Sequence, residues 1–407
     1  MTSEPAAISG PLDFGQAGVI GSVNQQGRLM AVSAYHAQYG IVALTSAPPF
    51  VEDDRYRPES VRSYRRGLAA LDGFGLVFDS PVVRREALLL HDVTPSVRLW
   101  LGDGTYAECV TWATSRCMVQ RWHFTDGAPR AHISGRVWLQ RAAYTQLTEG
   151  GPLPMPSTRS EVFRVGAFSG LENPALGWAV CFEGIVCEPL DDGSAQLSGA
   201  VAGGESWTLV IGMGASRDEA CANARQLRDA EAPEPVAWGD VPPDLLLRRG
   251  LVYGRMCCVP VESESVCILT DHMLLPLSWN RDAYYVARAL LAWAQRVPEQ
   301  ASLFDVVRGH LVWMFETAQR MNGLWGRSYL ANGRIKDQGF QLDQQLFPLL
   351  DLADYVLLTG DRPTFDRLAG HIPALFAALR PYRLDDRPLY ATDETPADDP
   401  IALPYHL

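Results

Sequence analysis

The sequence contains almost no lysine and no basic stretch. Lys336 is the only lysine, arginine carries the remaining positive charge, and the 407 residues have a formal net charge of −12. A nucleic-acid-binding protein neutralises phosphates with clustered lysine and arginine. We therefore expect no nucleic-acid partner.

Membrane and export signals are also missing. No apolar run approaches the ~18 residues that a membrane-spanning helix needs. The N-terminal stretch "MTSEPAAISGPLDFG" lacks the basic start and apolar run of a secretory signal. We expect a cytoplasmic protein with no membrane partner.

Metal-binding and cofactor motifs are absent as well. The sequence has no GxSxG, no glycine-rich phosphate loop and no HExxH, and its 8 histidines show no ligand spacing. The 8 cysteines are scattered without a CxxC pair, although Cys257 and Cys258 are adjacent. We expect no metal, no cofactor, and buried free thiols in a reducing compartment.

The first part of the chain is rich in short strand patterns. Asp-Gly turn signals at residues 103–104, 126–127 and 192–193 separate them. These features predict an antiparallel β-sandwich over residues 1–235. A helix over 216–230 and a linker rich in proline and acid over 231–243 follow. The strand patterns are "MAVSAY", "YGIVAL", "VRLWL", "ECVTWA", "CMVQRWHF", "HISGRVWLQ" and "SWTLVIGM".

After residue 244 the apolar spacing changes to that of helices. Helices are predicted from Asp282 onward, over 301–320, from about residue 342 to Gly360, and over 362–380 with a break near Pro373. Two apolar helix faces are expected, made of Ala283, Val286, Leu290 and Ala294, and of Leu342, Leu346, Leu350, Ala353 and Leu357.

Three acidic stretches recur at similar intervals in this helical part. "SWNRD" ends at Asp282, "GFQLD" at Asp343 and "TPADD" at Asp399, with separations of 61 and 56 residues. Each interval matches a helical hairpin with its loops, and the third helix is expected to begin only at the end of the chain. Stacked hairpins that present alternate helix starts at one place form an α/α toroid. The carboxylates are then expected to converge on one pocket.

The residue types at the first stretch suit a sugar. A carboxylate such as Asp282 accepts hydrogen bonds from hydroxyls, and a guanidinium such as Arg281 donates through its fork. Trp279, Tyr284 or Tyr285 can cover an apolar sugar face. The alternative is structural, with Asp282 capping a helix and Arg281 paired with a nearby acid.

The same stretch resembles a known enzyme family. Trp279, Arg281 and Asp282, followed by an apolar helix, look like the W-x-R-D segment of glucoamylases and related six-hairpin glycosidases. The resemblance implies a β-super-sandwich followed by an (α/α)6 toroid, and it assigns Arg281 and Asp282 to the terminal sugar of the substrate.

The second stretch resembles exo-α-1,6-mannosidases, which share the toroid. Its "FQLDQQLFPLLDLADY…TGD" is similar to their E-x-D-S…YPL…Y…TGD run, although Gln341 and Gln344 stand where that family has Glu and Ser. The resemblance implies that Gln341 and Asp343 point into the pocket. Lys336 and Asp337 on the preceding loop are expected to be a solvated pair.

The third stretch, "TDETPADDPIALPYHL", supplies candidates for the catalytic acid. It resembles the PSDD…YGYLIPS loop that carries the general acid of the mannosidases. Glycoside cleavage needs a protonated carboxyl, which a neighbouring carboxylate favours. Asp399, Asp398 and Glu394 are the catalytic candidates, and Asp393 stays open. An exposed acidic loop is the alternative.

These features favour an exo-acting glycoside hydrolase, of inverting mechanism, that acts on α-linked glucosides or related oligosaccharides. The alternatives are an α-mannosidase or a glycoside phosphorylase of the same architecture, and a carbohydrate-binding protein without catalysis. Six hairpins need more residues than follow Asp282, so we expect residues 244–407 to form an incomplete toroid that lacks the general base. By itself this chain is then expected to hydrolyse no glycoside.

Overall fold

The computed structural model describes residues 10–50, 58–125, 129–142, 153–201, 204–227, 230–273, 276–384, 389–394 and 400–406. The chain divides into two compact units. The first comprises Met1–Ala34, Ile41–Ala143 and Pro154–Val236, and the second comprises Tyr35–Gly40, Tyr144–Leu153 and Ala237–Leu407.

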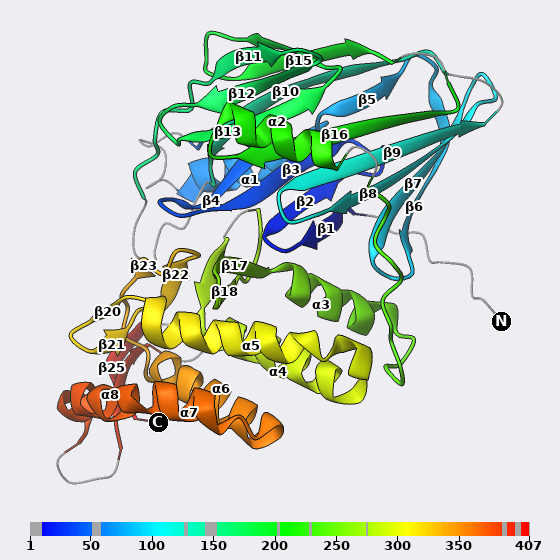
Figure 1. Ribbon diagram of the computed structural model, residues 1–407. Helices are drawn as coiled ribbons and strands as arrows, with labels where there is room; N and C mark the ends of the chain where they lie inside the picture. Colours follow the sequence, from blue (N-terminus) through cyan, green and yellow to red (C-terminus); the bar gives the residue numbers. More distant parts are fainter. Residues whose placement is uncertain are drawn as a thin grey trace. The chain divides into compact units, whose positions relative to one another are not determined.

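The first unit is built from β-strands with two helices (Figure 1). All seven strand patterns expected from the sequence are strands. The helix expected over 216–230 is α2, Arg217–Gln226, which begins at the N-cap Ser216. The elements are β1 Leu12–Gln16, β2 Val19–Val23, β3 Leu29–His36, β4 Gly40–Thr45, α1 Pro58–Ala69, β5 Gly75–Phe78, β6 Val82–Leu90, β7 Thr94–Leu101, β8 Tyr106–Ala113, β9 Cys117–Thr125, β10 Ala131–Arg141, β11 Glu161–Val165, β12 Phe168–Asn173, β13 Trp178–Glu183, β14 Val186–Pro189, β15 Ala195–Ala200, β16 Ser206–Gly214 and α2.

These strands form two 8-stranded sheets among the described residues. One has the order β1-β2-β3-β4-β10-β15-β14, with β5 also paired to β10. The other has the order β11-β12-β13-β16-β9-β8-β7-β6, and every neighbouring pair in it is antiparallel. The large antiparallel sheets expected for this part of the chain are therefore present.

A buried glutamine links the two sheets in the core. Gln120 of β9 donates from Nε2 to the carbonyl of Gly27, in the turn between β2 and β3, at 2.8 Å. Its Oε1 accepts from Trp122 Nε1 at 3.1 Å, and the Trp122 ring meets Phe78 of β5 edge-on at 5.5 Å. Because its amide is satisfied at both ends, Gln120 can lie among apolar side chains at low cost.

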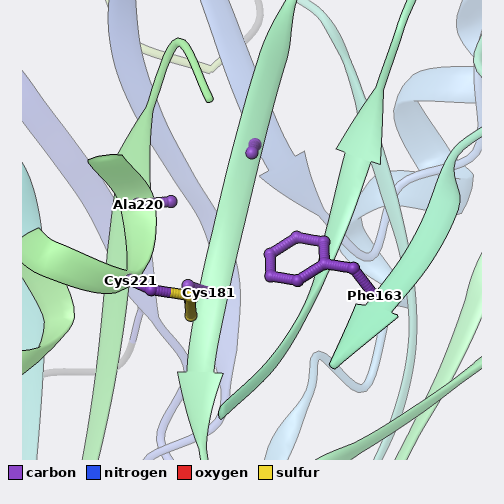
Figure 2. Close-up of a cluster of buried hydrophobic side chains, with 5 residues drawn as sticks. Phe163, Cys181, Ala220 and Cys221 are labelled. Carbon is purple, nitrogen blue, oxygen red and sulfur yellow. A yellow bond between two sulfur atoms is a disulfide. The ribbon is translucent and has the colours of Figure 1, made fainter. Parts of the chain in front are cut away.

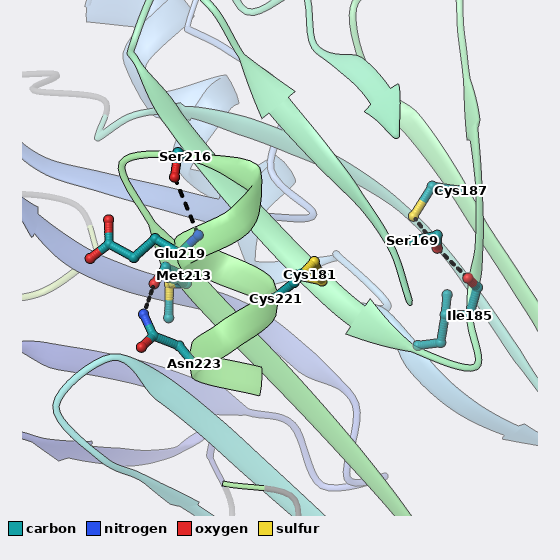
Figure 3. Close-up of a disulfide and its surroundings, with 9 residues drawn as sticks. All are labelled: Ser169, Cys181, Ile185, Cys187, Met213, Ser216, Glu219, Cys221 and Asn223. Carbon is teal, nitrogen blue, oxygen red and sulfur yellow. Dashed lines mark hydrogen bonds between the residues drawn. A yellow bond between two sulfur atoms is a disulfide. The ribbon is translucent and has the colours of Figure 1, made fainter. Parts of the chain in front are cut away.

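Helix α2 packs on strands β13 and β16, and a disulfide fixes it there (Figure 3). Cys181 of β13 is bonded to Cys221 of α2, with their Cα atoms 5.3 Å apart. Figure 2 shows the bond beside Phe163 and Ala220 in a buried cluster. The expectation of free thiols is wrong for this pair, since the fold places the two cysteines at bonding distance. The other 6 are free and buried.

The second unit carries most of the helices (Figure 1). No described helix combines the length and apolar content that crossing a membrane requires. The elements are α3 Leu245–Met256, β17 Cys258–Glu262, β18 Ser265–Ile268, β19 Leu277–Trp279, α4 Asn280–Arg296, a 3-10 turn Pro298–Gln300, α5 Ser302–Val312 with a wider final turn Trp313–Thr317, β20 Arg320–Met321, β21 Leu324–Trp325, β22 Ser328–Leu330, β23 Ile335–Asp337, α6 Leu342–Thr359, α7 Arg362–Leu368, 3-10 turns Ala369–His371 and Arg380–Tyr382 on either side of α8 Ile372–Leu379, β24 Ala391–Glu394 and β25 Pro400–His406.

The expected helices of this unit are confirmed, with one exception. Helix α6 ends at Gly360, whose φ of 72° is the left-handed conformation that glycine adopts readily. The fourth helix is divided into α7 and α8, and the break falls just before Pro373. The third pocket-facing helix was expected at the end of the chain. Instead Pro400–His406 is strand β25, paired antiparallel with β24.

The apolar face expected for α6 is only partly buried. Leu342 is 4% exposed, whereas Leu350 and Leu357 are 47% and 84% exposed. Gln344, Gln345 and Asp351 are at most 2% exposed. The buried polar face makes specific hydrogen bonds at the start of the helix, described below. Asp351 Oδ1 has no hydrogen-bond partner among the described residues, and burial raises the pKa of this carboxyl well above its usual range.

We predict that removing the disulfide destabilises the first unit. In the chain-entropy model, a bond across 40 residues stabilises the folded state by about 3–4 kcal/mol. Dithiothreitol should therefore lower the urea midpoint of the wild-type protein, measured by circular dichroism. The double variant Cys181→Ala/Cys221→Ala should not respond to dithiothreitol. An unchanged wild-type midpoint under reduction contradicts the prediction.

The buried carboxyl of Asp351 predicts a pH dependence of stability. Its raised pKa means that, as the pH rises above about 4, where an aspartate ionises in the unfolded chain, the folded state still keeps the proton. Wild-type stability should therefore fall with rising pH relative to Asp351→Asn, which binds no proton. Urea unfolding at several pH values measures this difference. The exposed Asp366→Asn is the control, and parallel pH profiles of wild type and Asp351→Asn contradict the prediction.

Candidate functional site

Helix α4 starts directly after the short strand β19 and is capped from another helix. Its N-cap residue is Trp279, which makes no side-chain capping hydrogen bond. Instead the backbone N–H of Arg281 donates to Gln344 Oε1 of α6 at 2.9 Å. Asn280 Nδ2 donates to the carbonyls of Gln344 and Gly326 at 2.9 and 3.1 Å. The first turns of α4 and α6 are therefore held against each other.

Helix α6 is capped in a similar way by a residue of β24. Its N-cap residue, Gln341, makes no side-chain capping hydrogen bond. The N–H of Leu342 donates to Thr392 Oγ1 of β24 at 3.0 Å, and this hydroxyl donates to the carbonyl of Glu394 at 3.0 Å. The capping threonine thus places Glu394 beside the start of α6.

The first turns of α4 and α6 also bring two predicted binding residues together. Arg281 Nη1 lies 3.0 Å from Asp343 Oδ2. The side chains are 18% and 16% exposed, so both remain partly accessible. Asp282 is the third residue of α4 and is half-buried. It is not the N-cap residue, whereas the pairing of Arg281 with a nearby acid, the other part of the structural alternative, is present in Arg281–Asp343.

A buried arginine connects the remaining predicted residues. Arg327 Nε donates to Asp337 Oδ2 at 2.7 Å, and its Nη2 donates to the same oxygen. Its Nη1 donates to Glu394 Oε2, which Gln341 Nε2 approaches at 3.4 Å. The guanidinium carbon lies 5.9 Å from the centre of the Trp279 ring. Arg327 therefore joins residues from β19, β23, β24 and the start of α6.

Lys336 and Asp337 are not the solvated loop pair that the sequence predicted. They are 3% and 5% exposed. Their burial follows from the strand β23 that contains them and from the pairing of Asp337 with Arg327.

Aromatic residues extend from this cluster along α4. Tyr284 is buried and donates to Asp354 Oδ2 at 3.1 Å; burial and this hydrogen bond raise its pKa. Tyr285 is 58% exposed and lies 5.9 Å from Phe347, which is one turn after Asp343. Of the two tyrosines, Tyr285 is the one accessible to a ligand.

The structure thus brings together Trp279, Arg281, Gln341, Asp343 and Glu394, with Asp282 on the same first turn of α4. We call these six residues, together with Arg327, the carboxylate cluster. Asp398 and Asp399 lie outside the described residues. Asp393 is exposed.

Three important residues were missed from the sequence. Arg327, Gln344 and Thr392 stand in no recognisable motif, and each acts on a residue at least 50 positions away. The only sequence feature that singled out Gln344 was that the mannosidase run has a serine at this position. His272 is buried against Tyr253, whose hydroxyl is 3.2 Å from its Nδ1, in agreement with a structural role.

The described residues contain no group of three His, Cys, Asp or Glu side chains placed to hold a metal ion. Two cavities of about 370 and 330 Å³ lie away from the carboxylate cluster. The first is lined by α1 and the segment before it, and the second by α4 and α6 around Arg288 and Asp354.

Comparison with known proteins supports the fold. No protein-family model and no curated protein matches the sequence. Among solved structures, the chain is similar to a bacterial glucoamylase in complex with acarbose, with a TM-score of 0.54 and 11% identity. The match covers 95% of this chain and 61% of the glucoamylase chain. The chain therefore has a glucoamylase-like fold over nearly its whole length, and it spans less than two thirds of that enzyme.

We predict that Gln344→Met destabilises the second unit by about 1–2 kcal/mol, because it leaves the N–H of Arg281 without its acceptor. The substitution keeps the side-chain volume, so the loss reports mainly the hydrogen bond. Thermal and urea unfolding measure it. Gln295→Met, at an exposed position of α4, is the control. Equal stability of the two variants contradicts the capping role.

Proposed function

We propose that the protein is a glycoside hydrolase that binds the terminal sugar of an α-linked glucoside at the carboxylate cluster. The observation that carries the proposal is the meeting of the first turns of α4 and α6. It places Arg281 beside Asp343 and connects Trp279, Gln341 and Glu394 through Arg327.

The chemistry of these residues suits a pyranose. Sugar hydroxyls both donate and accept hydrogen bonds, and charged partners make the stronger ones. Asp343 Oδ1 and Asn280 Oδ1 accept no hydrogen bond from any described residue. Buried acceptors of this kind are usually satisfied by ordered water or a ligand. Exposed Tyr285 offers an aromatic face to the apolar side of a sugar ring.

The proposed reaction is exo-acting, inverting hydrolysis. It needs a proton donor at the glycosidic oxygen and a second carboxylate that activates water. Asp398 and Asp399 are the proposed donors. They follow Glu394 after three intervening residues in the sequence, and β25 begins at Pro400, which pairs with Glu394. The glucoamylase-like fold supports this reaction class, and the acarbose bound to that glucoamylase supports an α-glucoside as the ligand.

The test is a binding and turnover experiment on the protein. Isothermal titration with acarbose measures binding, and a panel of aryl α-glucosides and α-mannosides, followed by NMR of the product anomer, measures turnover. Turnover of α-glucosides with inversion supports the proposal. Turnover of mannosides alone changes the sugar. Binding without turnover supports the sugar site and agrees with the expected inactivity of this chain. Absence of both contradicts the proposal.

We predict that Asp343→Asn weakens acarbose binding by about 2 kcal/mol, roughly 30-fold, because it removes a charged acceptor and its pairing with Arg281. Titration calorimetry measures the change. Asp354→Asn is the matched control, since it makes the same change on the outer part of the same helix. Equal affinities of both variants remove Asp343 from the site.

A further inference from the structure

Arg327 is almost completely buried, and the described residues around its guanidinium hold that group in place. Its side chain is 4% exposed, and two of its nitrogens donate to Asp337. A Cβ added at Gly339 would lie 3.2 Å from the guanidinium carbon, so this glycine leaves the space that the group occupies. The Trp279 ring lies 5.9 Å away. The guanidinium is therefore a rigid charge rather than a mobile surface one.

The third nitrogen of this guanidinium holds Glu394. The Glu394 side chain is 24% exposed, so its carboxylate can meet both Arg327 and a ligand. The amide of Gln341 also approaches this carboxylate at 3.4 Å, and Asp337 binds the same guanidinium. On β24 itself, Asp393 is exposed, and Asp398 and Asp399 lie outside the described residues.

This arrangement favours one form of the Glu394 side chain. A guanidinium has only hydrogen-bond donors. A carboxylate accepts from it through both oxygens, whereas a protonated carboxyl uses one oxygen to donate and has less capacity to accept. An opposite charge at contact distance stabilises the ionised form. Protonation of Glu394 would take one negative partner away from the buried guanidinium of Arg327, which is costly.

We propose that Arg327 is a positioning residue that holds Glu394 as a carboxylate, so that Glu394 accepts hydrogen bonds from sugar hydroxyls and does not donate the proton for cleavage. The sugar-binding part rests on the proposed function above. If Glu394 does not donate the proton, Asp398 and Asp399 are the remaining candidates for the proton donor.

The electrostatic part is tested by NMR without any substrate. Protein labelled with ¹³C at glutamate side-chain carboxyls is titrated from pH 3 to pH 8, and Glu394→Gln assigns the signal of Glu394. In the wild type this signal should show the ionised form throughout the range above pH 4. In Arg327→Met its titration midpoint should rise by at least 1 pH unit, a tenfold change in the proton dissociation constant.

The wild-type titration by itself can overturn the proposal, whether or not Arg327→Met folds. A midpoint above pH 5 in the wild type contradicts it, and so does an unchanged midpoint in a folded Arg327→Met. Arg327→Lys keeps the charge but cannot donate to Asp337 and Glu394 in the same fork geometry. Its midpoint should lie between those of the wild type and Arg327→Met.

The sugar-binding part is tested with maltotriose by titration calorimetry at pH 5 and pH 7.5. Arg327→Met should lose more affinity at pH 5 than at pH 7.5, because a protonated Glu394 accepts hydroxyl hydrogen bonds poorly. An equal loss at both pH values indicates a merely structural role and contradicts the proposal. If wild-type protein binds no maltotriose, the proposed function and the sugar-accepting role of Glu394 both fail. The NMR titration still decides whether Arg327 holds Glu394 ionised.

Discussion

The carboxylate cluster depends on helix starts that are capped from elsewhere in the chain. Neither α4 nor α6 has a side-chain cap of its own, and the acceptors come from Gln344 of α6 and Thr392 of β24. Buried N–H groups at a helix start are costly when they have no partner. The start of α4 is therefore stable only with α6 in place, and the start of α6 only with β24 in place. The hydrogen bonds that stabilise the helices also set the geometry of the candidate site. This is because Arg281, Asp282 and Asp343 lie in the first turns of α4 and α6, and Glu394 lies beside the start of α6.

Polar burial follows from this arrangement. Gln345 pairs with the backbone of Trp325 through both ends of its amide, at 2.8 and 2.9 Å, and Arg327 meets Asp337 in a buried ion pair. Burying charges and amides costs free energy, which well-formed hydrogen bonds offset, and such networks are more useful for fixing positions than for adding stability. In the second unit these buried hydrogen bonds hold in place the residues of α4, α6 and β24 that contact one another.

Much of the fold could be predicted from the sequence, because strand alternation, Asp-Gly turns and helical spacing are local signals. The features that were wrong depend on contacts that are distant in sequence. Leu350 and Leu357 of α6 lie on the surface, while its buried polar side chains bind α4 and β21. Asp337 is buried in an ion pair with Arg327. The Cys181–Cys221 bond also depends on the tertiary position of α2, and a disulfide is more typical of an oxidising compartment than of the expected cytoplasm. For the candidate site, the W-x-R-D resemblance pointed to Arg281 and Asp282, and the acidic spacing pointed to Asp343; the structure places Arg281 and Asp343 together. Arg327 had no local signal.

The central proposal is that a sugar binds where the first turns of α4 and α6 meet β24. The most direct measurement is a crystal structure of the protein with maltotriose bound. We predict that the terminal glucose lies within hydrogen-bond distance of Arg281, Asp343 and Glu394. A maltotriose molecule that binds elsewhere, for example in the cavity beside α1, with the carboxylate cluster contacted only by water, would contradict it.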